Sequence, residues 1–470
     1  MANLQKWSIG LKAARKFASI DRIKVREPQV LDHKIITRFS VDGVDLLIKF
    51  NYSDDSTITK QDARIISVAP LVNYSLFTDE LSTDFPLSNV DISFFREMMK
   101  INSREVYINK ILKRREFFRP EIIPSVPDKS EADYIPLLDI REGPAEPVPF
   151  PTNGSVGILS SGGKESLLSY GMMKEVGANV FPIYINESGG HWKTAKVAYD
   201  YMSKRDINTL RVWTTVDRFY REMNSRVDAL DRKALKMWSD TYPIQLFIFP
   251  IYILSSLPYI RHHGISYVMK GDEFDDPRNM KEEFGMNHFY GVYDQTQAFD
   301  DRMTSYFREK GFGTSFFSGV RGISGYVEER ILFRRYPEIA RLQRSCHSCH
   351  SENGDMIPCG KCSKCNGVLL FLTANGIDPT IISYRKDDVK DFRRSFKDRK
   401  FRLDTDEMEH SIFVLTNGKE GKEHSHVEKI HQSGQCCDRA NIPEEFRDKI
   451  MRIIREYTQG NTELINEEWV

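Results

Sequence analysis

Apolar and polar residues alternate along two segments near the start of the chain, residues 33–40 and 44–52, with Val41-Asp42-Gly43 between them. Alternation with a period of two is typical of half-buried strands, and an Asp-Gly pair between such runs favours a tight turn. The pattern therefore predicts a β-hairpin. The other elements predicted in this region are a strand at 63–69, helices at 91–99 and 104–115, and a Pro-rich, acidic linker at 120–151.

The pattern changes at Ser155, where short apolar runs begin to alternate with helical segments. Residues 156–159 form an apolar run, a Ser-Ser-Gly-Gly loop and a helical pattern follow, and a second apolar run covers 180–185. This order of strand, loop, helix and strand is typical of a parallel α/β sheet. Further predicted elements are a helix at 194–204, a strand at 209–214, a helix at 245–259, a strand at 266–269 and a helix at 443–457.

These patterns predict an α/β protein with four parts. They are an N-terminal α+β domain with the linker (1–150), a parallel-sheet domain (151–345), a Cys-rich module (346–379) and a C-terminal extension (380–470). A length of 470 residues is compatible with this division.

Composition and charge exclude several classes of protein. With 40% hydrophobic and 29% charged residues, the chain is neither disordered nor a disulfide miniprotein. Lys and Arg total 67, as do Asp and Glu, so no bulk positive field draws the protein to nucleic acid or membrane. The most apolar run, 244–260, is interrupted by Pro250 and Pro258 and is too short to span a bilayer. It predicts a buried core helix with a kink or break near Pro250, in a soluble, cytoplasmic protein.

The loop Ser160-Ser161-Gly162-Gly163-Lys164-Glu165-Ser166 carries the first chemical signal. Its glycines let backbone amides approach an anion, two serines add hydroxyls, and Lys164 adds positive charge. The helix that follows would present its N-terminus to the same anion. The loop is therefore a candidate phosphate site, and a serine-capped turn is the alternative. Its spacing is not that of a Walker loop.

A second candidate is the acidic loop after the strand at 266–269. Asp272, Glu273, Asp275 and Asp276 could bind Mg²⁺ or a substrate amine, or could form a solvated turn. Ligands of open parallel sheets bind at the carboxyl ends of the strands, where this loop lies. Farther along the chain, Arg321 could clamp a carboxylate or phosphate. Asn287-His288 lies in the same segment, between the acidic loop and Arg321.

Five of the seven cysteines lie between residues 346 and 365. Such a cluster in an intracellular protein favours metal binding over disulfides. Cys359, Cys362 and Cys365 would bind Zn²⁺ together, with Cys346 or Cys349 as the fourth ligand and His347 or His350 as weaker options. A redox or iron–sulfur site is the rival interpretation. A second metal site in the tail is a weaker hypothesis, with candidates His424, His426, His431, Cys436 and Cys437.

The phosphate loop resembles the SGGxDS loop of the PP-loop, or N-type, ATP pyrophosphatases, with Glu165 in place of the usual Asp. The resemblance implies that Ser161, Gly162, Gly163 and Ser166 hold the pyrophosphate end of ATP and that adenine lies near Ile185. It also implies cleavage of ATP to AMP and pyrophosphate, with Mg²⁺, while a substrate oxygen is adenylated.

Two families that join a PP-loop to such cysteines are similar to this chain. Pro358-Cys359-Gly360-Lys361-Cys362 and Gly376-Ile377-Asp378-Pro379 resemble 7-cyano-7-deazaguanine synthase. Ser318-Gly319-Val320-Arg321-Gly322 and Arg344-Ser345-Cys346 resemble the ATP-dependent UDP-N-acetylmuramoyl-L-alanyl-L-glutamate epimerase, which favours Cys346 as the fourth zinc ligand. The chain departs from the epimerase pattern at Gly271-Asp272-Glu273 and Phe289, and from the synthase pattern at Ile244-Gln245.

The leading hypothesis is an enzyme that adenylates a substrate carboxylate, of glutamyl or deazapurine type, with Lys164, Asp272, Glu273 and Arg321 as catalytic candidates. The expected partners are ATP and a small carboxylate, with a homodimer and tRNA as further options. The alternatives are a tRNA- or nucleobase-modifying enzyme, for which 113–115 and 393–400 offer local basic stretches, and a non-catalytic ATP-binding zinc protein.

Overall fold

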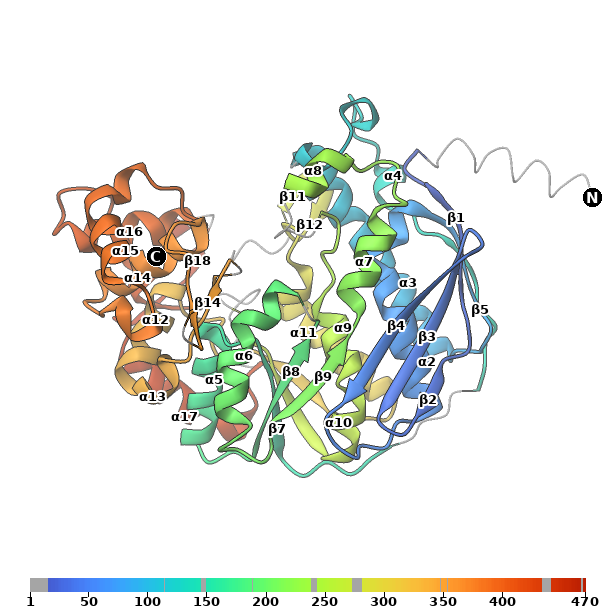
Figure 1. Ribbon diagram of the computed structural model, residues 1–470, viewed down its shortest axis with the longest axis horizontal. Helices are drawn as coiled ribbons and strands as arrows, with labels where there is room; N and C mark the ends of the chain where they lie inside the picture. Colours follow the sequence, from blue (N-terminus) through green and yellow to red (C-terminus); the bar gives the residue numbers. More distant parts are fainter. Residues whose placement is uncertain are drawn as a thin grey trace, which may run out of the picture. The chain divides into compact units, whose positions relative to one another are not determined.

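The computed structural model divides the chain into two compact units (Figure 1). The first holds residues 1–151, 212–262 and 279–313, and the second holds 152–211, 263–278 and 314–470. The residues that the structure describes are 16–113, 115–144, 149–187, 189–237, 243–272, 281–346, 348–352, 354–432, 441–465 and 468–470.

The first unit contains a mixed sheet in the order β4-β3-β1-β5-β6, with β2 also paired to β3. Its strands are β1 (Ile20–Val25), β2 (Gln29–Leu31), β3 (Lys34–Val41), β4 (Val44–Tyr52), β5 (Thr78–Thr83) and β6 (Leu137–Asp139). The predicted hairpin is confirmed, because β3 and β4 pair antiparallel around Asp42 and Gly43, whose φ angles are 48° and 81°. The strand pairs β1–β5 and β5–β6 are parallel.

Helices and short turns complete this unit. They are α2 (Lys60–Val68), η1 (Ala69–Phe77), α3 (Asn89–Val106), η2 (Tyr107–Lys113), η3 (Arg115–Phe117), η4 (Pro120–Ile122), α4 (Lys129–Ala132), α7 (Val216–Asn224), α8 (Arg232–Met237), α9 (Phe249–Ser255), α10 (Leu257–His262), η5 (Tyr293–Gln295) and α11 (Gln297–Glu309). A small hairpin joins β11 (Lys281–Glu283) to β12 (Met286–His288).

The strand predicted at 63–69 is wrong, since these residues belong to α2 and the start of η1. The hydroxyl of Thr59 accepts the amide of Asp62, and the Asp62 carboxylate accepts the amide of Thr59. This capping box fixes the first turn of a helix and overrides the apolar run that suggested a strand. Arg261 then pairs with the buried Asp62 at 2.7 Å.

The apolar run at 244–260 forms two short helices, α9 and α10, separated at Ser256. The helix predicted from residue 245 begins only at Phe249, so Pro250 lies in the first turn of α9, where its missing N–H costs nothing, and it does not kink a continuous helix. The break comes instead before Pro258, near the start of α10. Within the described residues, no helix combines the length and the apolar character that crossing a bilayer requires.

The second unit contains a parallel sheet in the order β13-β10-β7-β8. Its strands are β7 (Ser155–Ser160), β8 (Val180–Asn186), β10 (Ile265–Met269) and β13 (Ser315–Phe317). The predicted parallel α/β arrangement is therefore confirmed. The helices are α5 (Lys164–Glu175), α6 (Gly190–Met202), α12 (Gly325–Arg335), α13 (Pro337–Ala340), α14 (Ser363–Ala374), α15 (Lys386–Ser395), α16 (Thr405–Leu415) and α17 (Glu444–Arg455).

One hydrophobic core joins β7, β8, α5, α12, α14 and α17 of this unit. The cysteine module and the C-terminal extension thus pack into the same unit as the parallel sheet. The smaller elements are η6 (Pro379–Ile382), η7 (Phe396–Asp398), η8 (Ser425–Glu428), the hairpin β14 (His350–Glu352) with β15 (Asp355–Ile357), β16 (Ile430–His431) with β17 (Asn461–Thr462), and β18 (Leu464–Ile465) with β19 (Glu468–Trp469).

The units differ from the predicted domains in one main respect. Residues 212–262 and 279–313 were expected in the parallel-sheet domain but pack in the first unit. The end of β9 (Leu210–Thr214) pairs antiparallel with β4, and Phe219 of α7 lies 4.7 Å from Phe39 between ring centroids. Asn73 also binds both the amide and the carbonyl of Phe247. These long-range contacts complete the core of the first unit.

Candidate functional site

The phosphate loop joins β7 to α5, as the sequence predicts. Gly162 has a φ of +75°, and a Cβ there would lie 3.2 Å from the carbonyl oxygen of Thr194. Gly163 is the N-cap of α5 and supplies no side chain to cap it. The N-cap residue therefore supplies no side chain to the amides of the first turn, although the Glu165 carboxylate accepts its own amide. A helix N-terminus of this kind favours an anion.

The serine hydroxyls of the loop hold its shape. The Ser161 amide donates to Ser166 Oγ at 3.3 Å, and Ser166 Oγ donates to the Gly163 carbonyl at 3.1 Å. The Gly163 amide donates to Ser161 Oγ at 3.2 Å. Both serines thus preorganise the turn.

Lys164 and Glu165 form a charged pair at the start of α5. Lys164 Nζ lies 2.5 Å from a Glu165 carboxylate oxygen and 3.3 Å from Glu328, a fully buried residue of α12. Burial raises the pKa of Glu165, but the Lys164 ammonium beside it outweighs burial and holds that pKa below its usual value. The carboxylate also lies over the loop, because a Cβ on Gly163 would meet Glu165 Oε2 at 2.8 Å.

The loop after β10 packs directly against the first turn of α5. A Cβ on Gly271 would lie 2.6 Å from the Cβ of Glu165 and 3.1 Å from the amide nitrogen of Ser166. Only glycine allows this approach without a shift of the backbone. The two loops that the sequence singled out are therefore brought together.

Asp272 is the centre of a second buried charge cluster. Its carboxylate lies 2.8 Å from Lys270 Nζ and 2.9 Å from a terminal nitrogen of Arg321. The three side chains are almost completely buried, and the Ser318 hydroxyl donates to the Asp272 carbonyl at 2.9 Å. Asp272 and Arg321 were predicted from the sequence to belong to one site, whereas no role was predicted for Lys270. Glu273 lies outside the described residues.

These charges gather where β7, β10 and β13 end. Desolvated ion pairs cost free energy and are a weak means of stabilising a fold, so a cluster of them at this edge of a parallel sheet favours a functional site. Glu328 and Glu329, both fully buried in α12, were missed by the sequence analysis. The available signal was weak, because α12 also carries Arg330, Arg334 and Arg335, so an acidic pair in it resembles a solvated helix face.

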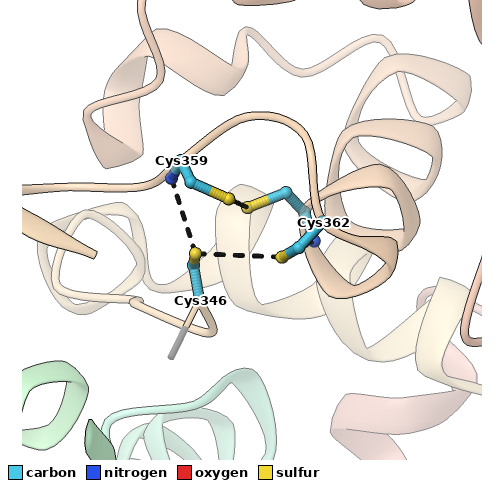
Figure 2. A group of neighbouring side chains, drawn as sticks. Cys346, Cys359 and Cys362 are labelled. Carbon is cyan, nitrogen blue, oxygen red and sulfur yellow. Dashed lines mark hydrogen bonds between the residues drawn. The ribbon is translucent and has the colours of Figure 1, made fainter. Parts of the chain in front are cut away.

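Four cysteine sulfurs converge in the second unit. The Sγ atoms of Cys346, Cys359, Cys362 and Cys365 lie within 4.8 Å of one another, and Figure 2 shows three of these side chains facing one point. The Sγ separations are 3.9 Å for Cys346–Cys362 and 3.8 Å for Cys359–Cys365. Tetrahedral zinc, with Zn–S bonds of about 2.3 Å, needs sulfurs about 3.8 Å apart. The group could therefore hold a metal such as zinc.

The surroundings of the sulfurs suit thiolates. The amides of Cys359 and Cys365 each donate to a sulfur, Cys346 Sγ and Cys362 Sγ respectively, at 3.4 Å. Hydrogen bonds from the neighbouring thiols lower the pKa of the Cys359 thiol well below the usual range. The same sharing of protons raises the pKa of Cys346 to about 11 and raises those of Cys362 and Cys365, so without a metal one sulfur of the four carries the negative charge. The five described cysteines form no disulfide. Among the described residues, the group contains Cys346 and not Cys349, the alternative left open by the spacing.

The cysteine group adjoins the phosphate loop. Arg344, two residues before Cys346, donates its backbone amide to the Gly162 carbonyl at 3.1 Å. Its buried guanidinium binds the carbonyls of Gln343 and Met356. Lys364, at the start of α14, lowers the pKa of Glu165 by its charge. The cysteine group and the phosphate loop thus share one local framework.

The remaining predicted residues lie elsewhere. Ile185 is half-buried near the carboxyl end of β8, where the resemblance placed adenine. His288 is buried in the first unit and accepts the amide of Tyr290 at 3.0 Å, and Asn287 precedes it in β12. His350 contacts Glu352 and Arg385 on the surface. His347, Cys436 and Cys437 lie outside the described residues.

Comparison of the chain with protein-family models, with curated proteins and with solved structures finds no match in any of the three.

Proposed function

We propose that the protein is a PP-loop ATP pyrophosphatase that adenylates a substrate carboxylate. The observation that carries the proposal is the contact between the glycine loop before α5 and the buried charge cluster after β10, at the edge where parallel strands end. A helix N-terminus suits a polyphosphate, and the adjacent cations suit a carboxylate.

The residues fit separate parts of this chemistry. The amides at the start of α5 would bind the pyrophosphate end of ATP, and Lys164 would neutralise charge that develops on it. Glu165 offers hard carboxylate oxygens to Mg²⁺, which supplies further charge neutralisation when bound. Asp272 holds Lys270 and Arg321 in place, so an incoming carboxylate would meet two oriented cations. The four-cysteine metal site would be structural.

The proposed reaction balances without another reagent. A carboxylate oxygen of the substrate attacks the α-phosphorus of ATP, the bond to the bridging oxygen breaks, and pyrophosphate leaves. The product is an acyl adenylate, in which AMP is a good leaving group for a later step. Glutamyl and deazapurine carboxylates are the substrate classes that the resemblances suggest.

The test is release of pyrophosphate from ATP and Mg²⁺ with a panel of these carboxylates. We expect one of them to stimulate release, and we expect Ser166→Ala to weaken ATP binding because it removes the hydroxyl that closes the loop. Ser169→Ala is the matched control, since Ser169 is also buried in α5 but lies one turn farther along. No release with any substrate, together with unchanged ATP affinity in Ser166→Ala, would overturn the proposal.

The alternatives give other outcomes in the same assay. Tight ATP binding without AMP would indicate the non-catalytic zinc protein. Salt-dependent tRNA binding would indicate the RNA-modifying enzyme. Two cations of the basic stretch 393–400 are engaged within the protein, since Lys397 pairs with Glu420 and Arg399 with Asp391. Adenylation of a carboxylate is therefore better supported than modification of RNA.

A further inference from the structure

A second group of metal-ligating side chains lies in the C-terminal part of the second unit. The possible ligand atoms of Asp406, His424 and His426 lie within 4.8 Å of one another. Asp406 is in the first turn of α16, and the two histidines flank Ser425 at the start of η8. The group shares no residue with the four cysteines or with the phosphate loop.

Two separations within this group match those of a zinc coordination shell, each to a different oxygen of the Asp406 carboxylate. His424 Nδ1 lies 3.4 Å from Asp406 Oδ1, and His426 Nε2 lies 3.3 Å from Asp406 Oδ2. Zinc bonds of about 2.0–2.2 Å to imidazole nitrogen and carboxylate oxygen, in a tetrahedron, place the ligands about 3.3–3.5 Å apart. The observed separations therefore leave room for one ion bound by all three residues.

The outer contacts of His424 are those of a metal ligand. Its second ring nitrogen, Nε2, lies 2.8 Å from a carboxylate oxygen of Glu409, one turn after Asp406 in α16. A ligand histidine usually donates its other ring N–H to such a carboxylate, which fixes the tautomer and the ring orientation. This contact leaves Nδ1, the nitrogen that faces Asp406, to carry the lone pair.

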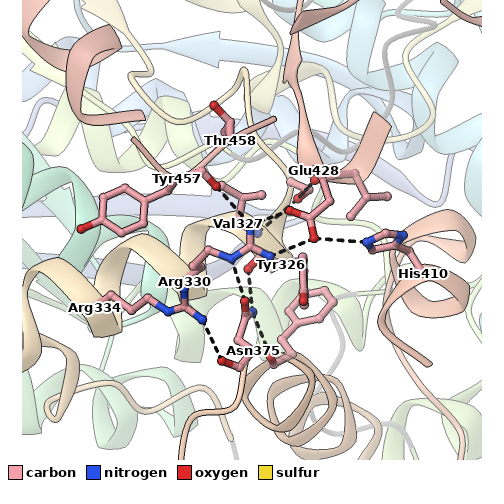
Figure 3. Close-up of polar contacts among 12 residues, drawn as sticks. Tyr326, Val327, Arg330, Arg334, Asn375, His410, Glu428, Tyr457 and Thr458 are labelled. Carbon is pink, nitrogen blue, oxygen red and sulfur yellow. Dashed lines mark hydrogen bonds and ion pairs between the residues drawn. The ribbon is translucent and has the colours of Figure 1, made fainter. Parts of the chain in front are cut away.

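The segment that carries both histidines is held by a buried polar network. The His424 amide donates to His410 Nδ1 at 3.2 Å, and His410 Nε2 lies 3.3 Å from Glu428. Arg330 pairs with both oxygens of Glu428 and also binds Asn375, as Figure 3 shows. Side chains placed on such a rigid support are preorganised for a ligand.

His426 also has a fixed environment. His431 Nε2 donates to the His426 carbonyl at 2.7 Å. The Trp469 indole stacks on the His426 ring with centroids 4.8 Å apart and an interplanar angle of 12°. The two histidine side chains are only 10–11% exposed, whereas Asp406 is 38% exposed, so solvent reaches the group from the carboxylate side.

We propose that Asp406, His424 and His426 bind a divalent transition-metal ion of the zinc class. Three protein ligands leave one tetrahedral position open, unlike the closed four-cysteine site. The open position would take water or an exchangeable small ligand. Nitrogen and oxygen donors also distinguish this site spectroscopically, because bound Co²⁺ would lack the thiolate-to-metal absorption that a cysteine site produces.

The experiment measures metal stoichiometry on the full chain. Purified protein is dialysed against Zn²⁺ and then freed of loosely bound metal, and zinc is counted per chain. We expect two ions in the native protein and one in His424→Ala and in Asp406→Asn. His350→Ala is the matched control, since His350 also faces a carboxylate, Glu352, but is outside the group, and it should keep both ions.

A second readout begins with the native protein, so its first result does not depend on how a variant folds. Co²⁺ added to native protein that retains its cysteine-bound zinc should quench Trp469 emission and give weak visible absorption without a thiolate band. Trp469→Phe should abolish the quenching and keep the absorption. One zinc per chain in native protein, with no saturable Co²⁺ signal, would overturn the proposal whatever the outcome of the ATP assay.

Discussion

The main-chain amide of Arg344 donates a hydrogen bond to the carbonyl oxygen of Gly162, linking the segment before Cys346 to the phosphate loop at 3.1 Å. The two signals that the sequence presented separately, a glycine loop and a cysteine cluster, are thus neighbours in one unit. A substitution in the cysteine cluster should therefore alter the phosphate loop, and a substitution in the loop should alter the cluster.

Loss of the cysteine-bound metal should weaken nucleotide binding. Cys362→Ser removes one of the four converging sulfurs, and we expect it to lose about one zinc ion per chain. Because Arg344 would no longer be held, ATP affinity should fall on the order of tenfold, or about 1.4 kcal/mol. Metal analysis and ATP titration measure the two effects.

Cys349→Ser is the matched control for this prediction, since Cys349 is buried in the same module but outside the metal group. It should keep its zinc and its ATP affinity. Equal loss of zinc in Cys349→Ser and Cys362→Ser would show that the metal is not held by the four converging cysteines alone.

Gly271→Ala should destabilise the second unit. The added methyl group would lie 2.6 Å from the Cβ of Glu165 and would push the two loops apart. Overpacking of this kind costs about 2 kcal/mol, measured by chemical denaturation. Gly322→Ala is the control, because its Cβ would meet nothing closer than 3.6 Å. An equal loss in both variants would mean that the loops can separate freely.

Asp272→Asn should leave two buried cations without their counter-charge. Lys270 and Arg321 both pair with Asp272, and removing one partner of a buried ion pair costs about 3–5 kcal/mol. Asp200→Asn removes an exposed i,i+4 partner of Lys196 and should change the free energy of unfolding by less than about 0.5 kcal/mol. Similar values for the two variants would argue that the Asp272 cluster is solvated.

Stability should decrease between about pH 4.5 and pH 7 because of Glu105. Burial raises the pKa of its carboxyl to about 7, against 4.5 for an ordinary glutamate, although the amides of Phe289 and Gly291 donate to it. In that range the unfolded chain loses the Glu105 proton while the native protein retains it. The contribution of this group to the free energy of unfolding therefore falls, by up to roughly 3 kcal/mol, and is constant above pH 7.

The measurement is the difference in unfolding free energy between the native protein and Glu105→Gln across this range. The glutamine does not titrate but cannot accept both backbone amides, so it sets a pH-independent reference. The stability of the native protein relative to the variant should decline up to pH 7. A difference that stays constant with pH would contradict the raised pKa.

Local spacing predicted the parts of the site that local geometry determines. Gly162, Gly163 and the Cys359, Cys362 and Cys365 set act within a few residues of one another, so their spacing was enough to single them out. The pairing of Lys164 with Glu328 could not be predicted in this way, because 164 residues separate the two in the chain and only the packing of α12 brings them together.

Fold predictions were wrong where a short-range signal competed with an apolar run. Thr59 and Asp62 form a capping box that starts α2, whereas the run that follows them suggested a strand. Likewise, Pro250 was expected to kink or break a helix and instead lies in the first turn of one. The Asp406, His424 and His426 group combines a close histidine pair with a distant aspartate, so only the two histidines were identifiable from spacing.

The pairing of β9 with β4 has a practical consequence for dissecting the protein. A truncation ending at the Pro-rich segment near residue 150 would remove α7, and with it the aromatic neighbour of Phe39 and the Phe247 backbone that Asn73 binds. Such a fragment would expose apolar surface and aggregate on expression. A separable version of the first unit would have to splice residues 212–262 and 279–313 onto it through designed connections.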